Sequence, residues 1–178
     1  MRPACTLSGQ DLVSNSRMAE TFFTLLLMLV ASNAGPVLVA WLLQSRWARP
    51  VDLGRQYRDQ RPIFGPAKTW RGVIAALAAA CAIALLLGYG AGFGIVFGLL
   101  VVAGDLLSSF IKRRMTLAPS TRCLGLDQLP ESLFPATYAV AVLGLAWWWA
   151  PLLALAFLLV DVLVSRPLYL LKIRKRPY

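Results

Sequence analysis

The sequence contains no histidine. This absence excludes imidazole as a general base, as the partner of a nucleophilic serine and as a metal ligand. Any catalysis by this chain must therefore rest on carboxylates, lysine, arginine, hydroxyl groups and a metal ion that prefers oxygen ligands.

Cysteine is also rare. The three cysteines, Cys5, Cys81 and Cys123, are odd in number and far apart in the chain. They form no Cys-x-x-Cys pair, so neither a zinc motif nor a disulfide framework is indicated. Cys81 lies in an apolar run and is expected to pack as a small hydrophobic residue.

Charged residues make up only 15% of the chain, whereas 58% of its residues are hydrophobic, a balance that soluble domains do not show. Three uncharged runs, at residues 21–44, 72–104 and 132–160, match or exceed the ~20 residues that a helix needs to cross a bilayer. No strand-like alternation accompanies these runs. We therefore predict an all-α, polytopic helical membrane protein.

The first two apolar runs divide into three expected transmembrane helices. The first helix covers residues 19–43 and should bend at Pro36, which cannot donate a backbone hydrogen bond. The second covers residues 72–87, and a glycine-rich turn leads to a third helix that ends near Ile111. Residues 1–18 are polar and without pattern. We expect this N-terminal extension to be disordered or to precede a natural start at Met18.

The last apolar run is too long for a single crossing. Three consecutive tryptophans followed by Pro151 are typical of a turn at the membrane interface. This pattern predicts a fourth helix over residues 132–149 and a fifth over residues 151–171. Residues 19–178 are then one transmembrane domain with five spans.

The basic residues lie almost entirely on one side of this five-span arrangement. All but two of the 18 Lys and Arg residues fall in segments 44–71, 112–131 and 166–178. Because such residues mark the cytoplasmic side, we expect an N-terminus outside the cell, two cytoplasmic loops and a cytoplasmic C-terminus in the cell's inner membrane. The net charge of +10 favours binding of anionic lipid headgroups. No nucleic-acid motif accompanies the charge, so we expect no nucleic-acid partner.

The stretch from Gly104 to Glu131 carries the strongest signal for chemistry. On a helix, Asp105, Ser108, Ser109 and Lys112 share one face, because they are spaced at i, i+3, i+4 and i+7. A carboxylate, hydroxyl groups and an ammonium group at a membrane surface suit a metal-bound phosphate. The alternative is a helix-end acid paired with a neighbouring arginine, but ionisable groups at membrane depth are usually functional.

Two further clusters complete the candidate site. Asp127 and Glu131 are four residues apart, and if the loop before them folds back, they join Asp105 in an oxygen-only site of the kind Mg²⁺ prefers. Lys68 and Arg71 precede the second span. They suit a phosphate clamp, although an interfacial basic flank explains them equally well.

Two other features are left open. Gly90, Gly94 and Gly98 form a ladder of small residues that indicates close helix packing, either within the chain or in a homodimer. Asp161 lies in the expected fifth span. It is either a structural buried acid or a neighbour of Asn33 or of the candidate site.

Three motifs in this order resemble a known family. They are Lys68-Thr69-Trp70-Arg71-Gly72 before the second span, Gly104-Asp105-Leu106 with Ser108 and Lys112-Arg113, and Leu126-Asp127-Gln128-Leu129 after a loop. Together they resemble the CDP-archaeol synthases, the small five-span relatives of the phosphatidate cytidylyltransferases. The resemblance covers nearly all of residues 19–178.

The resemblance implies transfer of CMP from CTP to a membrane lipid phosphate, which gives a CDP-lipid and pyrophosphate. The acceptor is an isoprenoid ether lipid phosphate or a phosphatidate-like lipid, since both present the same headgroup. The implied roles are metal binding of Mg²⁺ by Asp105, Asp127 and Glu131, catalysis by Lys68, Lys112, Arg113 and Ser108, and nucleotide binding by Thr69 and Arg71.

The chain departs from the family pattern at one position. The family has a second aspartate three residues after the first, whereas this chain has Pro130 there, followed by Glu131. We expect the carboxylate of Glu131 to replace the missing aspartate. The alternative is a catalytically inactive membrane protein that binds lipid headgroups or assists assembly.

Overall fold

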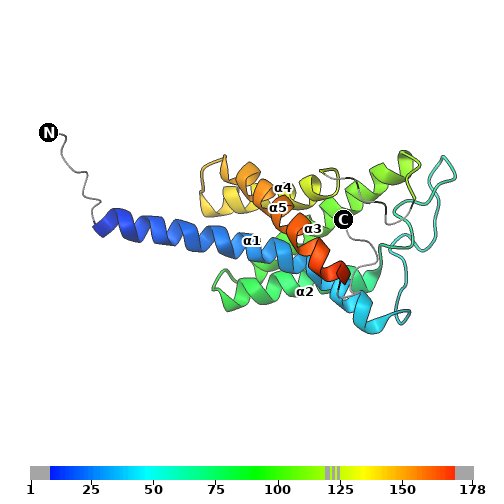
Figure 1. Cartoon of the computed structure of the whole chain (residues 1–178), viewed down its shortest axis with the longest axis horizontal. Coiled ribbons are helices and arrows are strands. Elements are labelled where there is room, and N and C mark those ends of the chain that lie inside the picture. Colours follow the sequence, from blue (N-terminus) through cyan, green and yellow to red (C-terminus); the bar gives the residue numbers. More distant parts are fainter. Residues whose placement is uncertain (1–8, 119–120, 122, 124, 171–178) are drawn as a thin grey trace.

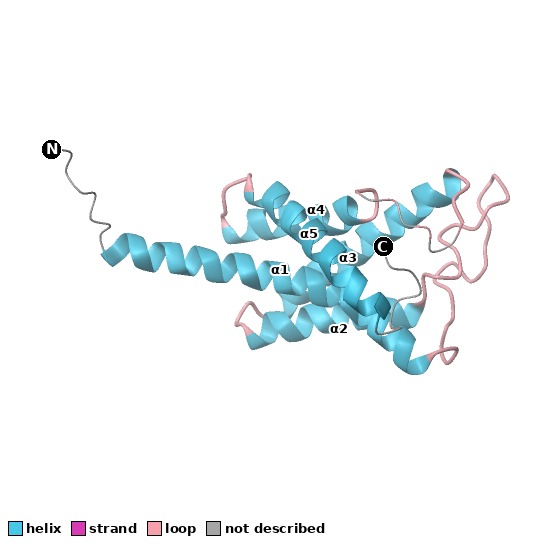
Figure 2. Cartoon of the chain, in the orientation of Figure 1, coloured by secondary structure: helices cyan, strands magenta, loops and turns pink. Residues whose placement is uncertain are grey.

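The computed structural model describes residues 9–118, 121, 123 and 125–170 of the chain. The described residues form five helices and no strand, which confirms the predicted all-α fold (Figures 1 and 2). The helices are α1 (Gly9–Leu43), α2 (Trp70–Leu86), α3 (Ala91–Arg114), α4 (Gln128–Leu143) and α5 (Trp149–Leu170).

Helix α1 begins earlier than the hydropathy predicts. We expected residues 1–18 to be disordered or to precede a natural start at Met18; residues 9–18 are helical and extend α1 beyond the other helices (Figure 1), while the natural start stays a prediction. Extending an existing helix costs far less than nucleating one, so a polar segment can continue an apolar helix. Residues 1–8 lie outside the described part. The helix continues on both sides of Pro36, where we expected a kink.

The turn between α4 and α5 lies a few residues before the expected position. We placed it between Trp149 and Pro151, whereas α4 ends before Gly144, whose φ of 66° closes the helix in the left-handed conformation. Glycine adopts this conformation without the steric cost that a side chain adds. Pro151 falls in the first turn of α5, where its missing N–H has no helical partner to lose.

Within the part of the chain that the structure describes, two segments are long and apolar enough to cross a membrane, namely Ser16–Leu43 and Ala91–Arg114. The apolar helices Trp70–Leu86 and Trp149–Val164 are shorter. The helical membrane architecture agrees with the prediction, while the number of five crossings stays a prediction.

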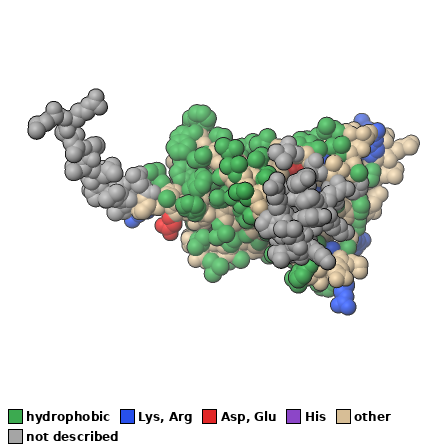
Figure 3. Space-filling model, viewed as in Figure 1, with side chains coloured by type: hydrophobic (Ala, Val, Ile, Leu, Met, Phe, Trp, Pro, Cys, Tyr) green, Lys and Arg blue, Asp and Glu red, His purple; other side chains and the backbone are tan. Residues whose placement is uncertain are grey.

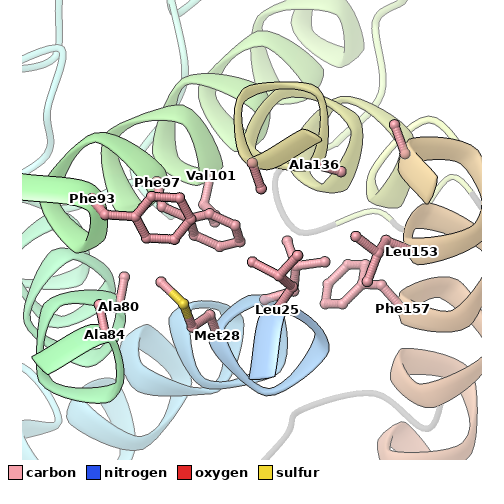
Figure 4. Close-up of a cluster of buried hydrophobic side chains, with 13 residues drawn as sticks. Leu25, Met28, Ala80, Ala84, Phe93, Phe97, Val101, Ala136, Leu153 and Phe157 are labelled. Atoms are coloured by element: carbon pink, nitrogen blue, oxygen red, sulfur yellow. The ribbon is translucent and has the colours of Figure 1, made fainter. Parts of the chain in front are cut away.

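The core of the bundle is built from large side chains on α1, α3 and α5 and from alanines on α2 and α4 (Figure 4). Leu25, Met28, Phe97 and Phe157 are all nearly inaccessible to solvent. Because α2 contributes alanines to this core, it can lie close to α3.

The glycine ladder produces this close approach of α2 and α3. A Cβ on Gly94 would lie 2.7 Å from the Cα atom of Cys81, and one on Gly98 would lie 3.1 Å from the Cβ of Ala80. The ladder is therefore used within the chain, as one of the two interpretations predicted. Gly90 instead lies in the α2–α3 turn with a φ of 82°.

The two ends of the bundle differ in character. The short turns between α2 and α3 and between α4 and α5 lie at one end, and the long segment 44–69 and the end of α3 lie at the other (Figure 1). We call the latter the loop end. On the face shown in Figure 3, hydrophobic side chains cover the middle of the bundle, and most visible Lys and Arg side chains gather at the loop end.

Candidate active site

The first charged pair of the site joins the α1–α2 loop to α3. The Nζ atom of Lys68 lies 2.5 Å from Oδ1 and 2.6 Å from Oδ2 of Asp105. The side chains are 26% and 36% exposed, so a polar ligand can reach both. The alternative partners for Asp105, the arginines that follow it on α3, make other contacts. The aspartate is therefore a member of a tertiary pair rather than a local helix-end acid.

The second pair joins α3 to the start of α4. The Nζ atom of Lys112 lies 2.6 Å from Oδ1 of Asp127 and donates to the backbone carbonyl of Thr121 at 3.2 Å. Oδ2 of Asp127 accepts a hydrogen bond from the backbone N–H of Cys123. With side chains only 9% and 18% exposed, this pair is more deeply buried than the first. Removing either partner would leave a buried charge without compensation.

Lys68 interacts electrostatically with the aspartates of both pairs, Asp105 and Asp127, and with Glu131. Burial lowers the pKa of the Lys68 ammonium, but the carboxylates of Asp105, Glu131 and Asp127 raise it more, so its pKa lies above the ordinary value. Lys68 is therefore charged at neutral pH. The three carboxylates proposed from the sequence act on one cation, which places them in one region.

Helices α3 and α4 are in close contact beside this region. A Cβ on Gly104 would lie 2.3 Å from the backbone oxygen of Pro130 and 2.6 Å from the Cα of Glu131. Only glycine fits there, because real Cβ atoms do not approach backbone atoms so closely. Because Gly104 has no side chain, the first turn of α4 packs directly against it, next to Asp105. This turn contains Pro130, the position at which the chain departs from the family pattern.

The loop that carries Lys68 is shaped by Asp52, which the sequence analysis did not identify. Its carboxylate accepts backbone hydrogen bonds from Gly54 at 3.0 Å, Phe64 at 3.0 Å and Gly65 at 2.8 Å. Burial raises the pKa of Asp52, but these N–H groups outweigh burial and hold it below its ordinary value. The backbone N–H of Lys68 in turn donates to the oxygen of Gly65. An Asp followed two residues later by Gly is the local signal for such a turn.

The same loop is held against the end of α3 by Arg114. Its guanidinium donates to Asp59 at 2.8 Å and to the backbone oxygen of Pro62 at 2.6 Å. It also lies over the rings of Tyr57 and Phe110, with its Cζ 5.0 and 4.8 Å from their centroids. These contacts attach the α1–α2 loop to the helix that carries Asp105 and Lys112.

Three of the four other predicted site residues donate side-chain hydrogen bonds within the chain. The hydroxyl of Ser108 donates to the backbone oxygen of Asp105, and the guanidinium of Arg113 donates to the oxygens of Leu117 and Ala118. Arg71 donates to the backbone oxygen of Arg46. Thr69 is the N-cap residue of α2, and its side chain makes no capping hydrogen bond.

The arrangement suits a divalent cation by its chemistry, although it presents no preformed cage. Among the described residues, no three Asp, Glu, Cys or His side chains lie close enough together to hold a metal ion. Asp105 and Asp127 each face a lysine instead. The carboxylates of Asp105, Asp127 and Glu131 nevertheless all interact electrostatically with Lys68. Carboxylate oxygens are the ligands that Mg²⁺ prefers.

The fold and this site define a helical membrane protein in which two lysine–carboxylate pairs lie at the loop end of the bundle. A model of the CarS-like CDP-archaeol synthase family matches residues 18–178. The CDP-archaeol synthase of Thermococcus onnurineus is 37% identical over 128 residues, which cover 62% of this chain and 68% of that protein. That of Saccharolobus islandicus is 30% identical over 156 residues, covering 84% and 89%.

A solved structure is also similar. It is described as "Structural insight into an intramembrane enzyme for archaeal membrane lipids biosynthesis", and it matches with a TM-score of 0.67 at 31% identity, covering 80% of this chain and 90% of that chain. The chain belongs to the CDP-archaeol synthase family. The resemblance inferred from the three sequence motifs is thereby confirmed.

Proposed function

We propose that the protein is a CTP-dependent cytidylyltransferase of the membrane, which transfers CMP from CTP to the phosphate of an isoprenoid ether lipid. Family membership supports the reaction, and the name of the relatives supports this acceptor. The observation that carries the proposal is the pairing of Lys68 with Asp105 and of Lys112 with Asp127 at the loop end. The relatives bear the name of an enzyme, so the comparisons give the inactive alternative no support.

The proposed reaction needs no histidine. A phosphate monoester has a second pKa of about 6, so the lipid phosphate is mostly a dianion at neutral pH and can attack without a general base. Its oxygen forms a bond to the α-phosphorus of CTP, and the bond from that phosphorus to the bridging oxygen of pyrophosphate breaks. Catalysis then consists of positioning the groups and stabilising the negative charge on the leaving pyrophosphate.

In this proposal the two lysines exchange partners when the substrate binds. Lys68 and Lys112 are held against carboxylates in the free protein, and the raised pKa of Lys68 keeps it protonated. Phosphate oxygens of CTP compete for these ammonium groups, which then stabilise the charge that develops on pyrophosphate. Thr69 and Arg71 flank Lys68 and bind the nucleotide. The contacts of Ser108 and Arg113 favour a role in positioning the end of α3.

Mg²⁺ is the proposed cofactor. Asp105, Asp127 and Glu131 would hold it through oxygen ligands once the lysines have turned to the triphosphate. A bound Mg²⁺ neutralises part of the charge on the phosphates. Glu131 takes the place of the family's second aspartate because the contact between Gly104 and Pro130 brings it against α3.

Purified protein incubated with CTP, Mg²⁺ and single lipid phosphates tests the function. We expect CDP-lipid and pyrophosphate to form fastest with an isoprenoid ether lipid phosphate, compared with phosphatidate and a polyprenyl phosphate. Mass spectrometry identifies the CDP-lipid, and a coupled assay follows pyrophosphate. Pyrophosphate release that no lipid phosphate stimulates would overturn the proposal.

We further propose that the loop end faces the cytoplasm, where the exposed Arg46, Arg49, Arg55 and Arg58 meet anionic headgroups. Cysteines introduced singly at exposed positions report the orientation in a background without native cysteine. An impermeant maleimide should label Ala146→Cys, in the α4–α5 turn, on intact cells. It should label Gln60→Cys, in the α1–α2 loop, only after the cells are permeabilised. The reverse pattern would show the opposite orientation.

A further inference from the structure

The start of α4 is tied to α5 by the side chain of Gln128. Its Nε2 donates to Oδ2 of Asp161 at 3.0 Å, and its Oε1 accepts from the backbone N–H of Gly125 at 3.0 Å. Gln128 is 2% exposed and Asp161 is 8% exposed. One end of the amide thus bridges two helices, and the other end closes the loop that enters α4.

Gln128 lies between the two carboxylates that α4 contributes to the site. Asp127 immediately precedes it and pairs with Lys112, while Glu131 follows in the same first turn. The carbonyl of Pro130 is in tight contact with Gly104, so this turn has no room to move toward α3. A change in the contact with α5 therefore shifts the positions of both carboxylates.

We propose that Gln128 and Asp161 form a positioning pair, which holds the first turn of α4 so that Asp127 and Glu131 face the substrate. The inference rests on the proposed function only in assigning those two carboxylates to the substrate. A hydrogen bond between two buried side chains strongly defines one geometry, because breaking it leaves the buried N–H group of Gln128 without this acceptor. Through this hydrogen bond, α5 contacts the turn that carries Asp127 and Glu131. Asp161 is the one residue of α5 that we assign to the site.

A charge swap tests the pair. Gln128→Glu keeps the shape and the acceptor for Gly125 but replaces the donated hydrogen bond with repulsion between two carboxylates. Asp161→Asn retains an acceptor for Gln128. The double variant Gln128→Glu/Asp161→Asn restores both a donor–acceptor contact and the original net charge. Gln128→Met, which removes both hydrogen bonds without adding charge, serves if Gln128→Glu does not fold.

Three measurements are made on each variant in nanodiscs, namely kcat and KM for Mg²⁺·CTP, binding of Mn²⁺·CTP by electron paramagnetic resonance, and the thermal midpoint. We expect Gln128→Glu to lose about tenfold to a hundredfold in kcat and in Mn²⁺·CTP affinity, the size of one broken buried hydrogen bond. The double variant should recover most of this loss. A purely structural role would lower the thermal midpoint and leave the affinity of the folded protein unchanged.

A readout without substrate separates this inference from the proposed function. Cys123 donates its backbone N–H to Asp127, so its thiol reports on the entry to α4. With Cys5 and Cys81 replaced, maleimide should label Cys123 faster in Gln128→Glu, and the double variant should return to the original rate. If the swap restores neither labelling nor kinetics, the pair is not a unit and the inference is wrong. If the swap restores labelling but no variant or parent makes CDP-lipid, only the proposed function fails.

Discussion

Asp105→Asn should abolish CMP transfer while the protein still folds and inserts into the membrane. The substitution keeps the shape of the side chain but removes the charge that faces Lys68. We expect turnover to fall at least ~10²-fold, comparable to the loss of one electrostatic group from an active site. The cost in stability should be small, because a partly exposed ion pair contributes about 0–1 kcal/mol. Single-turnover transfer of labelled CMP measures the first effect and thermal unfolding in detergent the second.

Asp59 offers a matched control for this variant. Its carboxylate pairs with Arg114, and its side chain is 37% exposed, compared with 36% for Asp105. Asp59→Asn removes the same chemical group from a pair of similar exposure outside the site. Its transfer activity should therefore remain close to that of the parent. Near-normal turnover in Asp105→Asn would show that Asp105 is structural and that the proposed site is wrong.

Glu131→Gln should raise the Mg²⁺ concentration needed for half-maximal activity and strongly reduce the maximal rate. The Glu131 side chain is 7% exposed, and its carboxyl makes no hydrogen bond or ion pair with any described residue. Burying a carboxyl group beside Asp105 and Asp127 is unfavourable for folding, although the charge of Lys68 offsets part of that cost. Replacing it with an amide should therefore leave stability unchanged or increase it, while activity falls. Loss of activity without loss of stability is the signature of a residue kept for function.

A purely structural Glu131 predicts the opposite pattern. In the first turn of α4 an acid complements the helix dipole, which contributes ~0.3–1 kcal/mol of stability and nothing to catalysis. Glu131→Gln would then lower the thermal midpoint slightly and keep full activity across a Mg²⁺ titration. Glu20→Gln, on the exposed part of α1, is the control for replacing a glutamate outside the site.

Much of the architecture follows from local features of the sequence. Uncharged runs and their interruptions by glycine and proline predicted the helical class and placed most helix ends within a few residues of those observed. The motif spacing placed Asp105, Ser108 and Lys112 on one helix. These predictions succeed because helix formation and lipid solubility depend on neighbouring residues along the chain.

The start of α1 and the turn before α5 differ from the predictions for reasons that hydropathy does not capture. Helix extension into residues 9–18 depends on an existing helix, and the left-handed conformation at Gly144 ends α4 before the tryptophans. The roles of Asp52 and Gln128 also remained hidden. Besides one local contact each, they bond to partners far away in the sequence, Asp52 to Gly65 and Gln128 to Asp161, and a single sequence does not show which polar groups meet.

The sequence by itself determined that this is a helical membrane protein with basic loops, and that carboxylates and lysines gather around the third span. Only the tertiary structure decided which cation faces which carboxylate, pairing Lys68 with Asp105 and Lys112 with Asp127. The physical reason is that these pairs join residues from different elements. The distance from Lys112 to Asp127 depends on how closely α3 and α4 approach, and the absence of a side chain at Gly104 permits that approach. The distance from Lys68 to Asp105 depends on how the α1–α2 loop lies against α3.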